Sequence, residues 1–269
     1  SIGILQGLTE FLPISSSAHL TLLPPALGWT DPLLNSAAFV VMLHLGTLAA
    51  LLLVFWRDLL RIAAAGIDLL RTRRIDDDPD RRLAVLLALS VVPAAVVGAL
   101  FEDFFDTWFR ENLLLIPVTL AAGALLLWVA ERRGRRDRGL ADLPPAGGLA
   151  IGAAQALALV PGISRSGVTI SAGLFVGLRR DDAARFAFLM GVPIIAGAGL
   201  WKARSLVAAP PAPDELAALV AGMLAAAVSG LVAIRGLLRY LRTRGLGIFV
   251  AYRLVAAVVF LALLLPRAA

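Results

Sequence analysis

Residues 6–19 read Q-G-L-T-E-F-L-P-I-S-S-S-A-H, and this stretch places polar side chains inside an otherwise apolar segment. Glu10 follows Gln6 by four residues, so a helix that ends before Pro13 puts both side chains on one face. Pro13 is followed by three hydroxyl side chains and one of the two histidines of the chain: Ser15, Ser16, Ser17 and His19. A carboxylate, an imidazole and serine hydroxyls in one helix-break-helix unit indicate acid–base or nucleophilic chemistry.

The composition of the 269-residue chain indicates a polytopic membrane protein. Hydrophobic residues make up 59%, charged residues make up 16%, and the mean hydropathy is +0.86, which excludes an ordinary soluble domain. Cysteine is absent, so disulfides and thiolate metal sites are excluded. The net charge of +6 comes almost wholly from arginines clustered between apolar spans, which favours orientation in a membrane over binding of nucleic acid. No cleavable signal peptide is expected, and an initiator Met is expected to precede Ser1.

Six stretches are apolar enough to cross a bilayer, which takes about 20 residues. We place them near residues 36–56, 83–101, 112–130, 183–201, 216–234 and 247–265. Arginines crowd the connections after the first, third and fifth stretches, which the positive-inside rule assigns to the cytoplasm. The connections at 101–111 and 202–215 are acidic or lightly basic and are expected outside. The expected fold class is therefore an all-α polytopic membrane protein with six transmembrane helices.

Two further apolar segments, residues 1–27 and 148–178, do not fit this alternation of charge. Pro13 breaks the first at mid-length, and Pro161-Gly162 breaks the second. We interpret both as re-entrant helical hairpins, which are tolerated where the freed backbone groups are buried in protein or face water. The six spans are thus accompanied by two hairpins that do not cross.

The two halves of the chain, approximately residues 1–135 and 146–269, are predicted to form an inverted-topology repeat within a single integral membrane domain, 1–269. Each half holds one hairpin and three spans, and because three is odd the second half enters the membrane from the opposite side. The residue order of the first hairpin also recurs in the second, as Gln155, Pro161 and Ser164-Arg165-Ser166. Paired broken helices of this kind usually meet near the midplane and build the site.

Residues 160–170 read V-P-G-I-S-R-S-G-V-T-I, a pattern that favours an anion. Pro161 and Gly162 permit a sharp turn, and a helix beginning after it points its free N–H groups at one place. Arg165 adds a planar fork suited to phosphate oxygens, although an arginine that snorkels to the membrane interface is the alternative. Hydroxyl donors flank the arginine at Ser164, Ser166 and Thr169.

Together the motifs at 6–19 and 160–170 resemble those of the undecaprenyl-pyrophosphate phosphatase family of bacteria, also called the bacitracin-resistance family. The resemblance covers essentially the whole chain. It implies hydrolysis of undecaprenyl pyrophosphate to the monophosphate and inorganic phosphate, which recycles the lipid carrier of peptidoglycan synthesis. It also implies a polyprenyl pyrophosphate substrate, Mg²⁺ or Ca²⁺ as cofactor, and a place in the bacterial inner membrane with the active site open to the periplasmic or outer face. A homodimer is left open.

The resemblance assigns catalytic roles to Glu10, Ser16, His19 and Arg165, and metal binding to Glu10 and Gln6. Gln6 stands where many members carry Glu. Substrate phosphates are expected to contact a wider set, namely Gln6, Ser15, Ser17, Gly162, Ser164, Arg165, Ser166 and Thr169. The expected chemistry is metal-assisted phosphoryl transfer, in which either Ser16 activated by His19 attacks phosphorus or His19 activates a water.

Two features of the spans have a structural interpretation. His44 is alone among apolar residues and is interpreted as a helix-packing histidine. Small residues spaced by four at Gly222, Ala226 and Gly230 predict a close helix–helix contact.

A second class of function stays open, because inverted repeats with broken helices are also the architecture of secondary transporters. A transporter or flippase of a lipid-linked or anionic substrate has no need for a serine, a histidine and a carboxylate opposite an arginine. Release of phosphate by the purified protein in detergent separates the two classes.

Overall fold

The computed structural model describes residues 1–75, 78–208 and 211–268, and within these ranges the chain is helical and forms no β-strand. The expected all-α class is confirmed. The elements are α1 Ile2–Phe11, α2 Ser16–Leu27, η1 Pro32–Asn35, α3 Ala37–Thr72, α4 Pro79–Glu111, α5 Leu115–Arg133, η2 Leu140–Asp142, α6 Pro145–Gln155, η3 Ala156–Leu159, α7 Arg165–Phe175, α8 Arg180–Ala208, α9 Pro213–Leu241 and α10 Gly247–Ala268, where η denotes a 3₁₀ turn.

In the described ranges, six helices are long and apolar enough to cross a membrane, which confirms the six predicted spans. They correspond to Ala38–Thr72, Pro79–Phe101, Leu115–Arg133, Arg180–Trp201, Glu215–Leu241 and Gly247–Pro266. Large apolar side chains on several of these helices face outward, as expected for surfaces that contact lipid.

Long parts of the predicted connections are instead helical, including 202–208 of α8 and the residues of α9 up to Leu241. The arginine-rich segment from Arg57 continues α3 as far as Thr72, and the acidic segment 101–111 forms the last turns of α4. Hydropathy marks the length of an apolar span but not the end of a helix, because charged side chains are good helix residues when they reach water or a partner. Asp58 is such a case, since its carboxylate pairs with Arg61 at 3.2 Å and with Arg185 of α8 at 2.7 Å.

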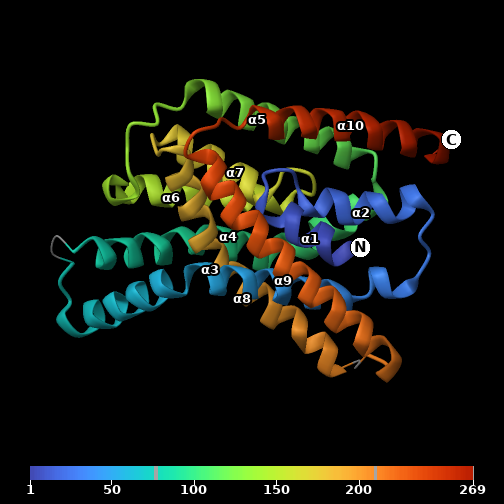
Figure 1. The fold of residues 1–269 in the computed structure, drawn as a ribbon, viewed down its shortest axis with the longest axis horizontal. Coiled ribbons are helices and arrows are strands. Elements are labelled where there is room, and N and C mark those ends of the chain that lie inside the picture. The colour runs from blue at the N-terminus through green and yellow to red at the C-terminus, as the bar shows by residue number, and fades with distance from the viewer. Residues whose placement is uncertain (76–77, 209–210, 269) are drawn as a thin grey trace.

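Helix α9 packs closely across α1 and α3 (Figure 1). A Cβ atom added at Gly7 of α1 would lie 2.4 Å from the carbonyl oxygen of Ala226, and one added at Gly46 of α3 would lie 2.2 Å from that of Met223. Such distances are shorter than any real Cβ contact, so the backbones approach as only glycine permits. The predicted close contact at the small residues of α9 is confirmed.

The pairs α1–α2 and α6–α7 form two helical hairpins that reach the centre of the molecule from opposite ends (Figure 1). The end of α7 lies beside the end of α5, where Arg138 and Leu178 form a bridge. The start of α1 and the end of α2 line a hollow with Leu113, at the other end of α5. The re-entrant placement in a bilayer and the division into two repeat halves stay predictions.

Candidate active site

The tips of the two hairpins are hydrogen-bonded to each other. Ser17, at the start of α2, accepts a hydrogen bond on its hydroxyl from the backbone N–H of Gly162 at 3.4 Å. Ser166, at the start of α7, donates from its hydroxyl to the carbonyl oxygen of Leu12 at 3.1 Å. The structure therefore brings together two motifs that lie about half the chain apart.

Matched local geometry at the two tips explains why these helices begin where they do. Ser15 and Ser164 precede α2 and α7, and both have a φ of 74°. Each hydroxyl then accepts a hydrogen bond from the N–H three residues on, from Ala18 at 3.3 Å and from Gly167 at 3.2 Å. This is N-capping, which satisfies a free donor of the first turn. Two residues whose predicted role was phosphate binding thus also shape the backbone of the site.

Glu10 is the centre of the site. Its side chain is 8% exposed, and its Oε1 atom lies 2.5 Å from the Nη2 atom of Arg165. Its Oε2 atom accepts a hydrogen bond from the hydroxyl of Ser16 at 2.6 Å and another from the amide of Gln6 at 3.2 Å. Charge-assisted hydrogen bonds of this kind are about twice as strong as neutral ones, and removal of one partner leaves an uncompensated buried charge. Four of the predicted site residues therefore form one connected unit.

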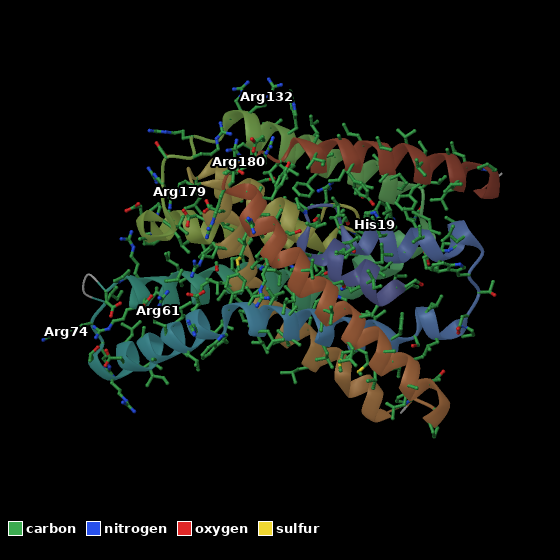
Figure 2. The ribbon with its side chains drawn as sticks, in the orientation of Figure 1. His19, Arg61, Arg74, Arg132, Arg179 and Arg180 are labelled. Carbon is green, nitrogen blue, oxygen red and sulfur yellow. The ribbon has the colours of Figure 1, made fainter. Side chains whose placement is uncertain are left out.

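His19 lies apart from that unit. Its Nδ1 atom donates to the carbonyl oxygen of Ser15 at 2.7 Å, which leaves Nε2 facing the hydroxyl of Tyr252 of α10, also at 2.7 Å. The two rings stack with centroids 5.7 Å apart, and Phe260 packs edge-on against the imidazole. Figure 2 shows His19 on α2 in the interior of the molecule. In this structure His19 does not contact Ser16, as one of the two expected mechanisms would require: both ring nitrogens have other partners, and the serine donates to the carboxylate of Glu10.

Two residues at the site were not identified from the sequence. Tyr252 is one of only two tyrosines in the chain and lies in an apolar span, which is the signal that could have found it. His44 was interpreted as a packing residue, and its Nδ1 atom does donate to the carbonyl of Val40 at 2.8 Å. Its imidazole is also close enough to interact electrostatically with the carboxylate of Glu10, so His44 borders the site.

The start of α7 can receive an anion. Gly162 has a φ of 98°, and a Cβ atom there would lie 2.1 Å from the hydroxyl of Thr119, so only glycine fits the turn. Thr169 donates its hydroxyl back to the carbonyl of Arg165 at 2.8 Å and is not free for a ligand. In the described chain, the backbone N–H groups of Arg165 and Ser166 make no hydrogen bond, which leaves donors for phosphate oxygens.

Two cavities adjoin these residues. A cavity of about 10 Å³ lies against Glu10 and Arg165, room for about one water and no more. A larger hollow of about 280 Å³ is lined mainly by apolar side chains, among them Ile2, Leu20, Pro24, Val40 and Leu43. Ile2 lies one helical turn before Gln6 on α1, and Val40 lies one turn before His44 on α3. The apolar hollow therefore ends close to the polar side chains around Glu10.

A divalent cation fits the donors present. The Oε1 atom of Gln6 is buried and has no hydrogen-bond partner within the described residues, and it belongs to the same cluster as the carboxylate of Glu10. No group of three or more His, Cys, Asp or Glu side chains gathers anywhere in the part of the chain that the structure describes. Proteins nevertheless usually supply only one or two oxygen ligands to Mg²⁺, and its other ligands come from substrate phosphates and water.

Known proteins match this chain over almost its full length. The family model described as "Bacitracin resistance protein BacA" matches residues 1–259. A protein of Moorella thermoacetica named undecaprenyl-diphosphatase is 46% identical over 261 residues, covering 97% of this chain and 95% of the relative. Proteins of the same name from Pelobacter propionicus and Rubrobacter xylanophilus are each 46% identical, over 255 and 264 residues. These cover 95% and 98% of this chain, and 92% and 96% of the relatives.

Proposed function

The chain belongs to the family of the bacitracin resistance protein BacA, and from this premise we propose that the cluster around Glu10 is where it hydrolyses its lipid pyrophosphate. The protein is an undecaprenyl-diphosphatase, which converts undecaprenyl pyrophosphate to undecaprenyl phosphate and inorganic phosphate. The observation that carries the site assignment is that the carboxylate of Glu10 holds both the hydroxyl of Ser16 and the guanidinium of Arg165. A transporter is not favoured.

Ser16 is the nucleophile in this proposal, and Glu10 is its general base. The hydroxyl already donates to Oε2 at 2.6 Å, within the reach that proton transfer requires. As the Oγ–P bond forms at the terminal phosphorus, the proton passes to Glu10 and the bridging P–O bond breaks, releasing undecaprenyl phosphate. Water then attacks the phosphoserine, the proton on Glu10 passes back to Oγ as the Oγ–P bond breaks, and inorganic phosphate leaves with the oxygen of that water.

Arg165 changes partner when substrate binds. The small cavity beside it has no room for a pyrophosphate, so the phosphate must take up contacts that Arg165 now makes with Glu10. Transfer of the guanidinium to phosphate oxygens stabilises charge that develops in the transition state. The free N–H groups of Arg165 and Ser166 add donors to the same phosphate.

Mg²⁺ or Ca²⁺ is the proposed cofactor, held by the carboxylate of Glu10 and the Oε1 atom of Gln6. When bound, the metal ion supplies positive charge that offsets the negative charge of the pyrophosphate.

His19 is assigned an orienting role. Its hydrogen bonds to Ser15 and Tyr252 connect the first turn of α2, which carries Ser16, to α10.

The apolar hollow beside the polar side chains around Glu10 is the proposed binding site for the first isoprene units of the substrate. It lies at the end of the molecule opposite the arginines that Figure 2 labels on the helix ends and connections, among them Arg74, Arg132 and Arg179. By the positive-inside rule those arginines face the cytoplasm, so the hollow opens toward the periplasm of an inner-membrane protein.

The test is release of phosphate from undecaprenyl pyrophosphate by the purified protein in detergent, where transport produces no signal. Glu10→Gln removes the base and is expected to abolish release. Glu131→Gln is the matched control, because that carboxylate also pairs with an arginine, Arg180, at 2.5 Å but lies at the far end of α5. Substantial turnover by Glu10→Gln at saturating metal would remove Glu10 from the mechanism.

A further inference from the structure

Arg253 of α10 is fully buried, and its partners in the described chain are all backbone carbonyl groups. The Nε atom donates to Leu120 of α5 at 3.2 Å, and Nη1 donates to Pro13 at 3.3 Å. Nη2 donates to Gly162 at 2.8 Å and to Ile163 at 2.9 Å. The positive charge of a guanidinium that is buried away from solvent must be stabilised by polar groups of the protein, and here four carbonyl dipoles stabilise it.

Three of the four accepting carbonyl groups lie at the breaks in the two hairpins, where the backbone leaves the helix. Pro13 lies in the break between α1 and α2, and Gly162 and Ile163 lie in the break before α7. Carbonyl groups at such breaks lack a helical partner, and inside a membrane protein they need another donor. The guanidinium of Arg253 donates hydrogen bonds to both hairpin tips, because its planar fork carries N–H donors in several directions.

Two glycines leave space for this side chain. A Cβ atom added at Gly123 of α5 would lie 1.9 Å from the Nη2 atom of Arg253, and one at Gly167 of α7 would lie 2.8 Å from Nη1. Glycine inside a helix is unfavourable, so its presence on both sides of the guanidinium requires a reason. We call Gly123, Gly167 and the four carbonyl groups the Arg253 socket.

We propose that Arg253 is a positioning residue for hydrolysis, which sets the placement of one hairpin tip relative to the other. Ser16 and Glu10 belong to the first tip and Arg165 to the second, so their mutual geometry depends on how the tips are joined. Apart from the Glu10–Arg165 ion pair, the direct bonds between the tips, at Ser17 and Ser166, are two neutral hydrogen bonds. The bonds from Arg253 are also charge-assisted, and they still join the tips when Arg165 leaves Glu10 for the phosphate of the substrate. This inference rests on the proposed function.

The first experiment compares turnover and stability in two substitutions. Arg253→Gln removes the charge and most of the donors, and a misplacement of about 1 Å is expected to lower kcat about 100-fold. Arg253→Lys keeps the charge but not the fork, and an intermediate loss of about 10-fold is expected. Arg82→Gln is the control, because Arg82 also donates to a backbone carbonyl, that of Leu143 at 3.2 Å, far from the tips. A kcat within twofold of the parent in Arg253→Gln overturns the proposal.

A distance measurement separates positioning from general stability. The chain has no cysteine, so spin labels can be placed without background at Leu27 and Phe175, the exposed last residues of α2 and α7. In the labelled parent a single narrow distance distribution is expected, and Arg253→Gln is expected to broaden or shift it. An unchanged distribution in that variant also overturns the proposal. If the parent releases no phosphate, the proposed function fails, while the distances still decide whether Arg253 joins the tips.

If Arg253→Gln does not fold, Gly123→Ala tests the proposal in its place. It leaves the charge in place but puts a methyl group where the guanidinium lies. At a melting temperature close to that of the parent, a loss of kcat of at least 10-fold supports positioning by the Arg253 socket. Parental turnover in Gly123→Ala rejects it.

Discussion

Replacing Arg165 by lysine keeps a cation beside Glu10 but removes the planar fork that can bind two phosphate oxygens together. The Nη2 atom of Arg165 reaches to 2.5 Å from the Oε1 atom of Glu10, a contact that the shorter, pointlike ammonium of lysine does not reproduce. The loss is expected to be one charge-assisted hydrogen bond to the phosphate, worth about 1.5–3 kcal/mol. At about 1.4 kcal/mol for each factor of ten, kcat/KM should fall by about 10- to 150-fold.

The assay is phosphate release across a range of substrate concentrations, so that kcat and KM are obtained separately. A loss confined to KM would show that Arg165 binds substrate and transition state equally, whereas a loss in kcat shows stabilisation of the transition state. Arg180→Lys is the control, since Arg180 also pairs with a partly buried carboxylate, that of Glu131, but at the far end of α5 from the site. Turnover of Arg165→Lys equal to that of the parent would refute the phosphate-binding role of the guanidinium fork.

Further predictions concern other parts of the site and the packing beneath it. Ser16→Ala is expected to abolish phosphate release and trapping of radiolabelled phosphate on the chain, and full activity would point to an activated water instead. Tyr252→Phe removes the 2.7 Å bond to His19, worth about 0.5–1.5 kcal/mol, and should lower kcat about 2- to 10-fold without loss of yield. Gln6→Glu should stay active but change the preference in a Mg²⁺ and Ca²⁺ titration, and identical titrations would place the metal elsewhere. Gly46→Ala should destabilise the protein by about 1–3 kcal/mol in thermal unfolding, because its Cβ atom would meet the α9 backbone.

The six spans and the two broken segments could be predicted because both signals are local. A span is a run of apolar residues of sufficient length, and a break is a proline or glycine within such a run. The ends of α3 and α4 were misplaced for the same reason. Hydropathy falls at Arg57, but the helix continues to Thr72 because ion pairs such as Asp58–Arg185 support charged residues beyond the apolar run.

Some contacts of the site could also be predicted from local sequence spacing. Gln6 and Glu10 share a face because of helical periodicity, and the observed bond between them at 3.2 Å follows from a spacing of four. Ser16 and His19 are also neighbours in sequence, and one of the two expected mechanisms paired them, but in the structure they have different partners. The partner of Ser16 is Glu10 on the preceding helix, which depends on how the chain turns at Pro13.

By itself, then, the amino-acid sequence determined which segments are helical and apolar, where two of them break, and which polar groups lie at the breaks. Only the tertiary structure decided that Arg165 meets Glu10, that Tyr252 meets His19, and that Arg253 lies between both tips. The physical reason is that periodicity and hydropathy describe neighbours along the chain, whereas these contacts join helices from distant parts of it. Their geometry depends on how closely backbones approach at residues such as Gly123, and that is a property of two helices together.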